Sequence, residues 1–208
     1  ARSGELMVRR EEQPWRTRAT VFLDTRAVAH QGHGAASSFE WAVSAAASVA
    51  CHLARRGYSV RVVHSDGEWL RAGPTSADGL AGPEAEGPLL DTFALVTTTE
   101  GAAPKVRDAA GKSRVRDGLL VAVLGDLDTR HSEAVAALRH GHASALGLVL
   151  DPFAWATRAT DAERARAGRT ASLLTAAGWR VGLCDPRTDL AHTWRTLARA
   201  GVTAGGAR

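Results

Sequence analysis

The chain has 208 residues, of which 45% are hydrophobic, and this suits one sizeable globular domain with a full core. Its 26 basic and 22 acidic side chains give a net charge of +4, and the arginines are spread along the sequence. A charge this small and this dispersed is typical of a solvated surface and argues against a nucleic-acid-binding protein.

The two cysteines indicate a reducing compartment. Cys51 and Cys184 are far apart in apolar segments, and the sequence has no Cys-x-x-Cys motif. We therefore expect two buried free thiols, and no redox or zinc site built from cysteine. No stretch reaches the length of a membrane-spanning helix, and no secretory signal peptide opens the sequence.

The first half of the chain predicts strands and helices in alternation. Residues 4–12 predict an edge strand or hairpin, and residues 30–34 (HQGHG) a flexible loop that leads to a helix capped by Ser37 or Ser38. The other expected elements are a buried strand over 19–25, an amphipathic helix over 38–56, a strand over 58–64, a hairpin arm over 68–70, a loop over 73–88, a helix over 89–96 and a disordered loop over 101–112.

The second half continues the same alternation. It predicts a buried strand over 119–124, a helix over 132–140, a strand over 143–150, a helix over 161–177 capped by Asp161, a strand over 179–184 and a last helix from Asp189. This order predicts an α/β fold with a doubly wound, mostly parallel sheet, helices on both faces and right-handed crossovers. We expect an N-terminal edge segment over 1–18 and one domain over 19–208.

Acidic residues follow several predicted strands. Asp24 ends the first buried strand, Asp126 follows the strand over 119–124, and Asp151 and Asp185 follow two later strands. The carboxyl ends of parallel strands meet at one edge of the sheet, where α/β proteins bind ligands. If Asp24 and Asp126 face one point, they offer oxygen ligands for a divalent cation such as Mg²⁺.

Arg26 favours a different interpretation of these carboxylates. It stands two residues after Asp24, where a metal site would need a hydroxyl. A guanidinium repels a metal ion and binds carboxylates itself. The aspartates then cap turns and helices or pair with Arg26, and we favour this alternative because an unpaired buried charge is costly.

Other motifs give weaker signals. His30 and His33 share one loop, and His140 and His142 flank a glycine, but neither pair has a third zinc ligand at a recognised spacing. Residues 111–113 (GKS) lack the glycine and the preceding strand of a phosphate-binding loop. No Gly-x-Ser-x-Gly motif supports a hydrolase.

The segment over 1–12 (ARSGELMVR, then EE at 11–12), the strand ending in Asp24-Thr25 and the helix with AAAS at 45–48 resemble the bacterial domain-of-unknown-function 58 family. The resemblance covers about the first sixty residues. It implies a von Willebrand factor A-like domain, a membrane anchor that precedes this soluble fragment in the parent protein, a location at the cytoplasmic face, and a MoxR-type AAA+ ATPase as partner.

The resemblance also implies where a metal site would lie. In von Willebrand factor A domains the first strand leads into an Asp-x-Ser-x-Ser motif, and here Asp24 keeps the aspartate while Arg26 and Val28 replace both serines. Asp126 matches the aspartate of the later strand, and one of the threonines over 97–99 matches the motif's threonine. The resemblance thus implies a degenerate metal site.

We expect a non-catalytic domain that binds another protein, without a cofactor and without nucleic acid. The expected binding surface is the carboxyl edge of the sheet, formed by Asp24, Thr25, Arg26, His30, His33, Ser37, Ser38 and Asp126. The alternative is a divalent-metal-dependent ligand-binding domain or enzyme that uses the same edge.

Overall fold

A six-stranded sheet forms the centre of the molecule. The computed structural model describes residues 18–65, 69–70, 79–101, 118–141 and 144–199, and the expected strand over 4–12 lies outside them. The strands are β1 (Arg18–Leu23), β2 (Ser59–His64), β3 (Trp69–Leu70), β4 (Leu119–Leu124), β5 (Ser144–Leu150) and β6 (Arg180–Cys184). Their spatial order is β3-β2-β1-β4-β5-β6. All pair in parallel except β3, which is antiparallel to β2, so the expected mostly parallel α/β sheet is confirmed.

The central strands are apolar on both faces because both faces are covered. The residues of β4 read LLVAVL, and all but the first are buried. In register, Val21 of β1 lies between Val62 of β2 and Val121 of β4. Such continuous apolar runs are typical of parallel strands inside an α/β protein.

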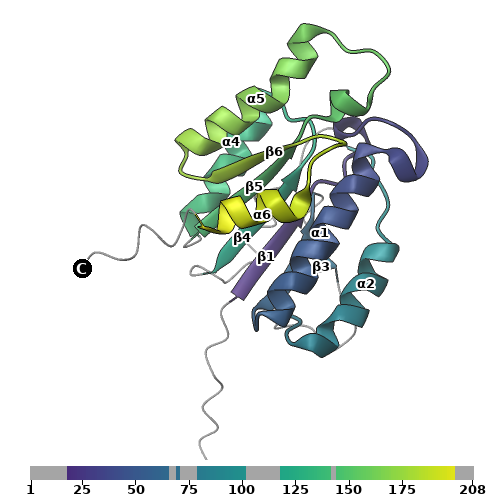
Figure 1. Ribbon diagram of the computed structural model, residues 1–208. Coiled ribbons are helices and arrows are strands. Elements are labelled where there is room, and N and C mark those ends of the chain that lie inside the picture. Colours follow the sequence, from purple (N-terminus) through teal and green to yellow (C-terminus); the bar gives the residue numbers. More distant parts are fainter. Residues whose placement is uncertain (1–17, 66–68, 71–78, 102–117, 142–143, 200–208) are drawn as a thin grey trace, which may run out of the picture.

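Helices cover the sheet on both faces (Figure 1). They are α1 (Ser38–Arg55), α2 (Glu86–Ala94), α4 (Thr129–Ala137), α5 (Asp161–Ala176) and α6 (Leu190–Arg199). One apolar cluster joins the sheet to α1, α2 and α6, and a second joins its other face to α4 and α5. The described part is therefore a three-layer, doubly wound structure, as the alternation of elements predicts.

The direction of winding changes between β1 and β4. The chain leaves β1 through α1 to reach β2 on one side, and it leaves β4 through α4 to reach β5 on the other. In open α/β sheets, ligands bind at such a switch point, beyond the carboxyl ends of the strands. Asp24 follows β1 and Asp126 follows β4, so the fold brings both predicted residues to this point.

Three helices differ from the expectation at their N-terminal ends, α2 and α4 in where they begin and α5 in its capping residue. The loop expected over 73–88 ends early, because α2 begins at Glu86 and accommodates Pro88 in its first turn, where a missing N–H breaks no helical hydrogen bond. Helix α4 begins at Thr129 because the Asp128 carboxylate accepts a hydrogen bond from the His131 N–H at 2.8 Å. Thr160, not Asp161, caps α5.

Both cysteines are buried free thiols, as expected. No helix within the described residues is both long and apolar enough to cross a membrane.

Candidate functional site at the carboxyl edge of the sheet

Asp24 is fully buried at the end of β1. Its backbone N–H donates to the Val123 carbonyl of β4 at 2.9 Å, which fixes it at the switch point. Both carboxylate oxygens accept from the Arg26 guanidinium: Nε donates to Oδ1 at 2.9 Å and NH2 donates to Oδ2 at 2.7 Å. The N–H groups of Arg26 and Gly125 add bonds of 3.2 and 3.4 Å. The carboxylate therefore has a complete set of donors from the chain itself.

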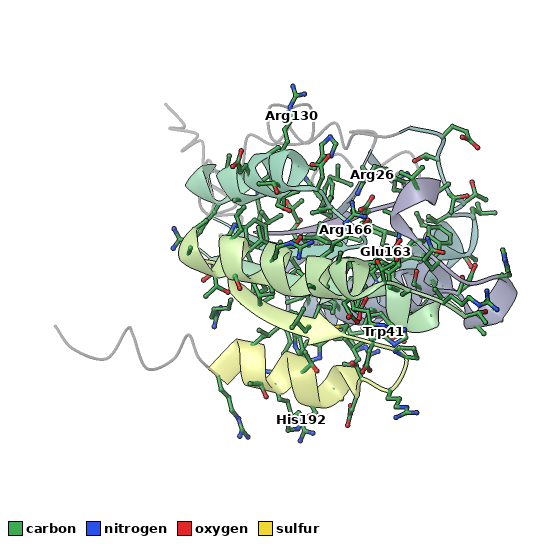
Figure 2. All side chains as sticks on the ribbon, turned by 90° about the horizontal axis from the view of Figure 1, so that it is seen from above. Arg26, Trp41, Arg130, Glu163, Arg166 and His192 are labelled. Carbon is green, nitrogen blue, oxygen red and sulfur yellow. The ribbon has the colours of Figure 1, made fainter. Side chains whose placement is uncertain are left out.

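Arg26 links the segments that follow β1 and β4 at the switch point. Its side chain is 5% exposed, and its NH2 group also donates to the Asp126 carbonyl oxygen at 2.9 Å. A bidentate pair of this kind is short and directional, and it neutralises the buried charge of Asp24. Figure 2 looks down on this edge and shows Arg26 near its centre, beside Arg166.

The Asp126 carboxylate turns to a different arginine. The Oδ2 atom of Asp126 lies 3.2 Å from NH1 of Arg166, which comes from α5. The side chain of Asp126 is 14% exposed. Burial raises the pKa of Asp126, while Arg166 and Arg26 act to lower it. Asp24 and Asp126 thus lie at one edge as predicted, but their carboxylates face separate guanidinium groups and do not converge on a cation site.

His30 holds the loop after β1 against the start of α1. Its Nε2 lies 2.8 Å from the Asp24 carbonyl oxygen, which can only accept, so Nε2 carries the hydrogen. In the neutral ring Nδ1 then accepts from the Ser38 hydroxyl at 3.2 Å, and that hydroxyl oxygen accepts from the Gln31 N–H at 2.9 Å. Burial lowers the pKa of His30 and so favours this neutral form.

Three hydroxyl groups meet on the other side of Asp24. The Thr25 hydroxyl lies 2.9 Å from that of Ser65 and 3.1 Å from that of Thr99. The backbones of Thr25 and Thr99 are also joined, by an N–H to carbonyl bond of 2.7 Å. Among the threonines over 97–99, Thr99 is the one in contact with this site.

The expected binding surface is mostly interior. Six of its eight residues are buried, namely Asp24, Thr25, Arg26, His30, Ser37 and Ser38. His33 is exposed and Asp126 is half-buried. The loop expected over 30–34 lies between two short 3-10 helices, Ala27–Ala29 and Gly34–Ala36, and the first of them carries Val28, which is 62% exposed. The buried polar residues shape this edge, and Val28 and His33 are among its exposed side chains.

The remaining strand-end acids are local caps, which is the alternative that the sequence favoured. The Asp151 carboxylate accepts from the Phe153 N–H at 3.1 Å, and the Asp185 carboxylate accepts from the Arg187 N–H at 2.8 Å and the Thr188 hydroxyl at 2.9 Å. Among the described residues, no group of three or more His, Cys, Asp or Glu side chains is placed to hold a metal ion.

Sequence reasoning missed two residues of the site. Ser65 follows β2, so its place at the carboxyl end of a strand was a usable signal. Arg166 lies in the middle of a helix that is far away in sequence, and nothing in its local pattern pointed to Asp126. The sequence matches no protein-family model and no curated protein.

Proposed function

We propose that this chain is a von Willebrand factor A-like domain that binds another protein through the carboxyl edge of its sheet without a metal ion. The observation that carries the proposal is the buried pair of Asp24 and Arg26. The guanidinium takes both carboxylate oxygens of Asp24, which are the oxygens a metal would need. The residues around Asp24 do not fit a divalent cation, and the positive charge that a cation would bring comes from Arg26.

Two further features support the von Willebrand factor A-like assignment. Asp24, Thr99 and Asp126 come from three separate segments, and they gather around Arg26 at the switch point between β1 and β4. The resemblance places the aspartates of the metal motif at Asp24 and Asp126, and its threonine at one of the residues over 97–99. This placement supports the proposal of such a motif, with arginine in place of its first serine.

The exposed part of the edge is the contact surface that we propose. Val28 projects from the 3-10 helix after Arg26, and the exposed His33 precedes the second 3-10 helix. Buried ion pairs and hydrogen bonds hold the backbone under both residues, so the surface is preorganised and little entropy is lost on binding. A MoxR-type AAA+ ATPase is the partner class that we propose, on the strength of the resemblance over the first sixty residues.

A melting experiment tests the metal-independence. The melting temperature of the wild-type chain is measured with Mg²⁺, with Mn²⁺ and with EDTA. We expect no shift, whereas a ligand at about a hundred times its dissociation constant would add about 2.7 kcal/mol of stability. A clear rise with metal that is lost in Asp24→Asn would contradict the proposal and favour the metal-dependent alternative.

A binding experiment tests the surface. Purified MoxR-type ATPase is passed over immobilised chain, either wild type or Val28→Arg. We expect Val28→Arg to weaken binding at least about tenfold, since a charge in the centre of an interface costs more than about 1.4 kcal/mol. Arg199→Glu, an exposed change at the end of α6 beside the start of β6 and so at the opposite edge of the sheet, is the control and should bind as wild type. Equal binding by all three would exclude this surface.

A further inference from the structure

A pocket opens at the amino edge of the sheet, opposite the candidate site. It has a volume of about 500 Å³, which is within the usual range for a small-molecule site. Leu119, Ser144 and Arg180, the first residues of β4, β5 and β6, line it on the side of the sheet. Helices α1 and α6 supply its other walls, and Figure 1 shows them on the same face of the sheet.

The charged side chains that line this pocket are all basic. Arg56 comes from the end of α1, His52 stands one turn before it, and Arg180 comes from β6. Among the described residues, no carboxylate lines the pocket, and none forms an ion pair with Arg56 or Arg180. The neighbouring Arg55, by contrast, is paired with Glu86 at 3.1 Å. The pocket therefore carries positive charge, from two separate elements, that no described acid neutralises.

The end of α6 holds Arg180 in place. Its NH1 group donates to the carbonyl oxygen of Leu197 at 2.7 Å, and to that of Ala198 at 3.4 Å. A guanidinium has five N–H donors in one plane, so these contacts leave donors for a ligand. Phosphate and carboxylate groups accept two such bonds at once, which makes them the groups that arginine binds best.

The rest of the lining is largely apolar and aromatic. Leu53 and Leu146 are buried, and Tyr58 and Trp194 are half-buried. The His52 ring stands edge-on to the Trp194 indole, with the ring centroids 6.0 Å apart and the ring planes at 78°. Aromatic side chains pack favourably against other rings, and apolar walls with a few polar groups are typical of ligand pockets. A ligand that suits this lining has an anionic group on an apolar ring.

We propose that the pocket at the amino edge binds a small organic anion, in which a phosphate or carboxylate group is attached to an aromatic ring. The anionic group would accept hydrogen bonds from Arg56 and Arg180, and the ring would lie against Tyr58 and Trp194. The pocket is at the edge of the sheet opposite Val28, so this inference does not depend on the proposed function.

Isothermal titration calorimetry with phenyl phosphate and with benzoate, at about pH 7.5, tests this pocket. We expect Arg56→Gln and Arg180→Gln each to weaken binding at least about tenfold. Arg55→Gln is the matched control, because Arg55 is next to Arg56 in the chain but does not line the pocket, and it should bind as wild type. Inorganic phosphate, which lacks the ring, should bind at least about tenfold more weakly than phenyl phosphate. Circular dichroism confirms that each variant is folded.

The pKa of His52 gives an independent measurement at the same place. Burial, and then the charges of Arg56 and Arg55, lower this pKa from its ordinary value of 6.5. An anion bound in the pocket adds a negative charge near the ring, so saturating phenyl phosphate should raise the pKa of His52. NMR titration of the ring signals, assigned with His52→Gln, measures the change. The ring signals of His33, at the carboxyl edge, should not respond to the ligand.

Several results would overturn the proposal. One is the absence of binding of either ring compound at about 10 mM. Another is equal weakening by Arg55→Gln and Arg56→Gln, since binding would then follow the general charge at the end of α1. A pKa of His52 that does not change at saturation would place the ligand elsewhere, and inorganic phosphate bound as tightly as phenyl phosphate would exclude a role for the ring. Tighter binding of phenyl phosphate would assign the pocket to phosphates and tighter binding of benzoate to carboxylates, and each supports the proposal.

Discussion

At the end of β1, the charge of one buried side chain is balanced by another only two residues away. Asp24 and Arg26 are 0% and 4% exposed. A buried carboxylate is costly unless it is paired and hydrogen bonded, and Arg26 meets both needs with two N–H···O bonds. This pair explains how a buried carboxylate at the end of β1 is stable inside the protein.

Breaking the Asp24–Arg26 pair should cost far more than removing both partners. We expect Arg26→Met and Asp24→Leu each to lower the free energy of unfolding by about 3–5 kcal/mol, because each leaves an uncompensated buried charge. The double variant should lose much less than the sum of the two. Urea unfolding of the four proteins gives the coupling energy, and additive losses would show that the two charges do not compensate each other.

His30 should make stability depend on pH. Burial lowers its pKa below the ordinary value of 6.5, so between the two pKa values only the unfolded chain binds the proton. The contribution of His30 is complete above about pH 6.5 and is lost as the pH falls toward the folded-state pKa. Urea unfolding at about pH 7.5 and about pH 5.5 should show a smaller difference for His30→Gln than for wild type. An unchanged difference would show that other groups cause the pH dependence. His52→Gln tests a second histidine whose pKa is lowered.

At the scale of elements, the loop after β1 and the end of β4 are packed in backbone contact. The Asp126 N–H donates to the Ala29 carbonyl at 2.9 Å, and a Cβ built on Gly125 would lie 2.4 Å from the same oxygen. Any side chain at position 125 would therefore push the 3-10 helix Ala27–Ala29 away from β4. Local sequence shows that Gly125 follows a strand, but not that another segment crosses above it.

Gly125→Ala should be clearly destabilising for this reason. We expect a loss of about 1–3 kcal/mol from overpacking, with disturbance of the Asp24 site above it. Gly87→Ala is the matched control, because Gly87 lies in α2 and a Cβ added there would meet no atom from outside its own helix within 4 Å. Removing glycine from a helix stabilises by about 0.5–1 kcal/mol. Chemical denaturation measures the free energy of unfolding of both variants. Similar destabilisation of the two would show that the contact with the Ala29 carbonyl is not the cause.

At the scale of the whole molecule, the sheet separates two apolar clusters. Cys51 on α1 and Cys184 at the end of β6 belong to the same cluster, although β1, β4 and β5 lie between β2 and β6. Burial raises the pKa of Cys184 to about 12 and also raises that of Cys51. Both thiols are thus protonated and inaccessible in the folded protein, and their reactivity reports on how the cluster opens.

Both thiols should react with a disulfide reagent at about pH 8 only through unfolding of the whole domain. Cys51→Ser and Cys184→Ser each leave one thiol. We expect the labelling rate of each variant to follow its own unfolding equilibrium constant, because the thiol must be exposed by unfolding both to ionise and to meet the reagent. A much faster reaction of Cys184 would show that the edge strand β6 opens by itself. Labelling at urea concentrations above the unfolding transition gives the rate at which each thiol reacts in the unfolded chain.

The element order was predictable because apolar runs such as LLVAVL over 119–124 and the helical periodicity over 38–56 are local patterns that the fold preserves. The starts of helices were less predictable, because several residues within a short stretch can act as the N-cap. Asp128 makes α4 begin earlier than expected, and Thr160 caps α5 in place of Asp161. For the site, the sequence allowed prediction of Asp24, of Arg26 and of their location at the carboxyl ends of the strands. Which hydroxyl lies beside Thr25, and which arginine faces Asp126, depended on distant segments.

The sequence by itself determined the α/β class, the placement of Asp24 and Asp126 at one edge, and the presence of an arginine two residues after Asp24. These follow from hydrophobic periodicity and from the rule that parallel strands end at one edge. Only the tertiary structure decided that Arg26 is buried against Asp24, that Arg166 takes Asp126, and that Arg56 and Arg180 line one pocket. Burial and pairing between remote residues depend on packing in three dimensions, which the local order of side chains does not encode.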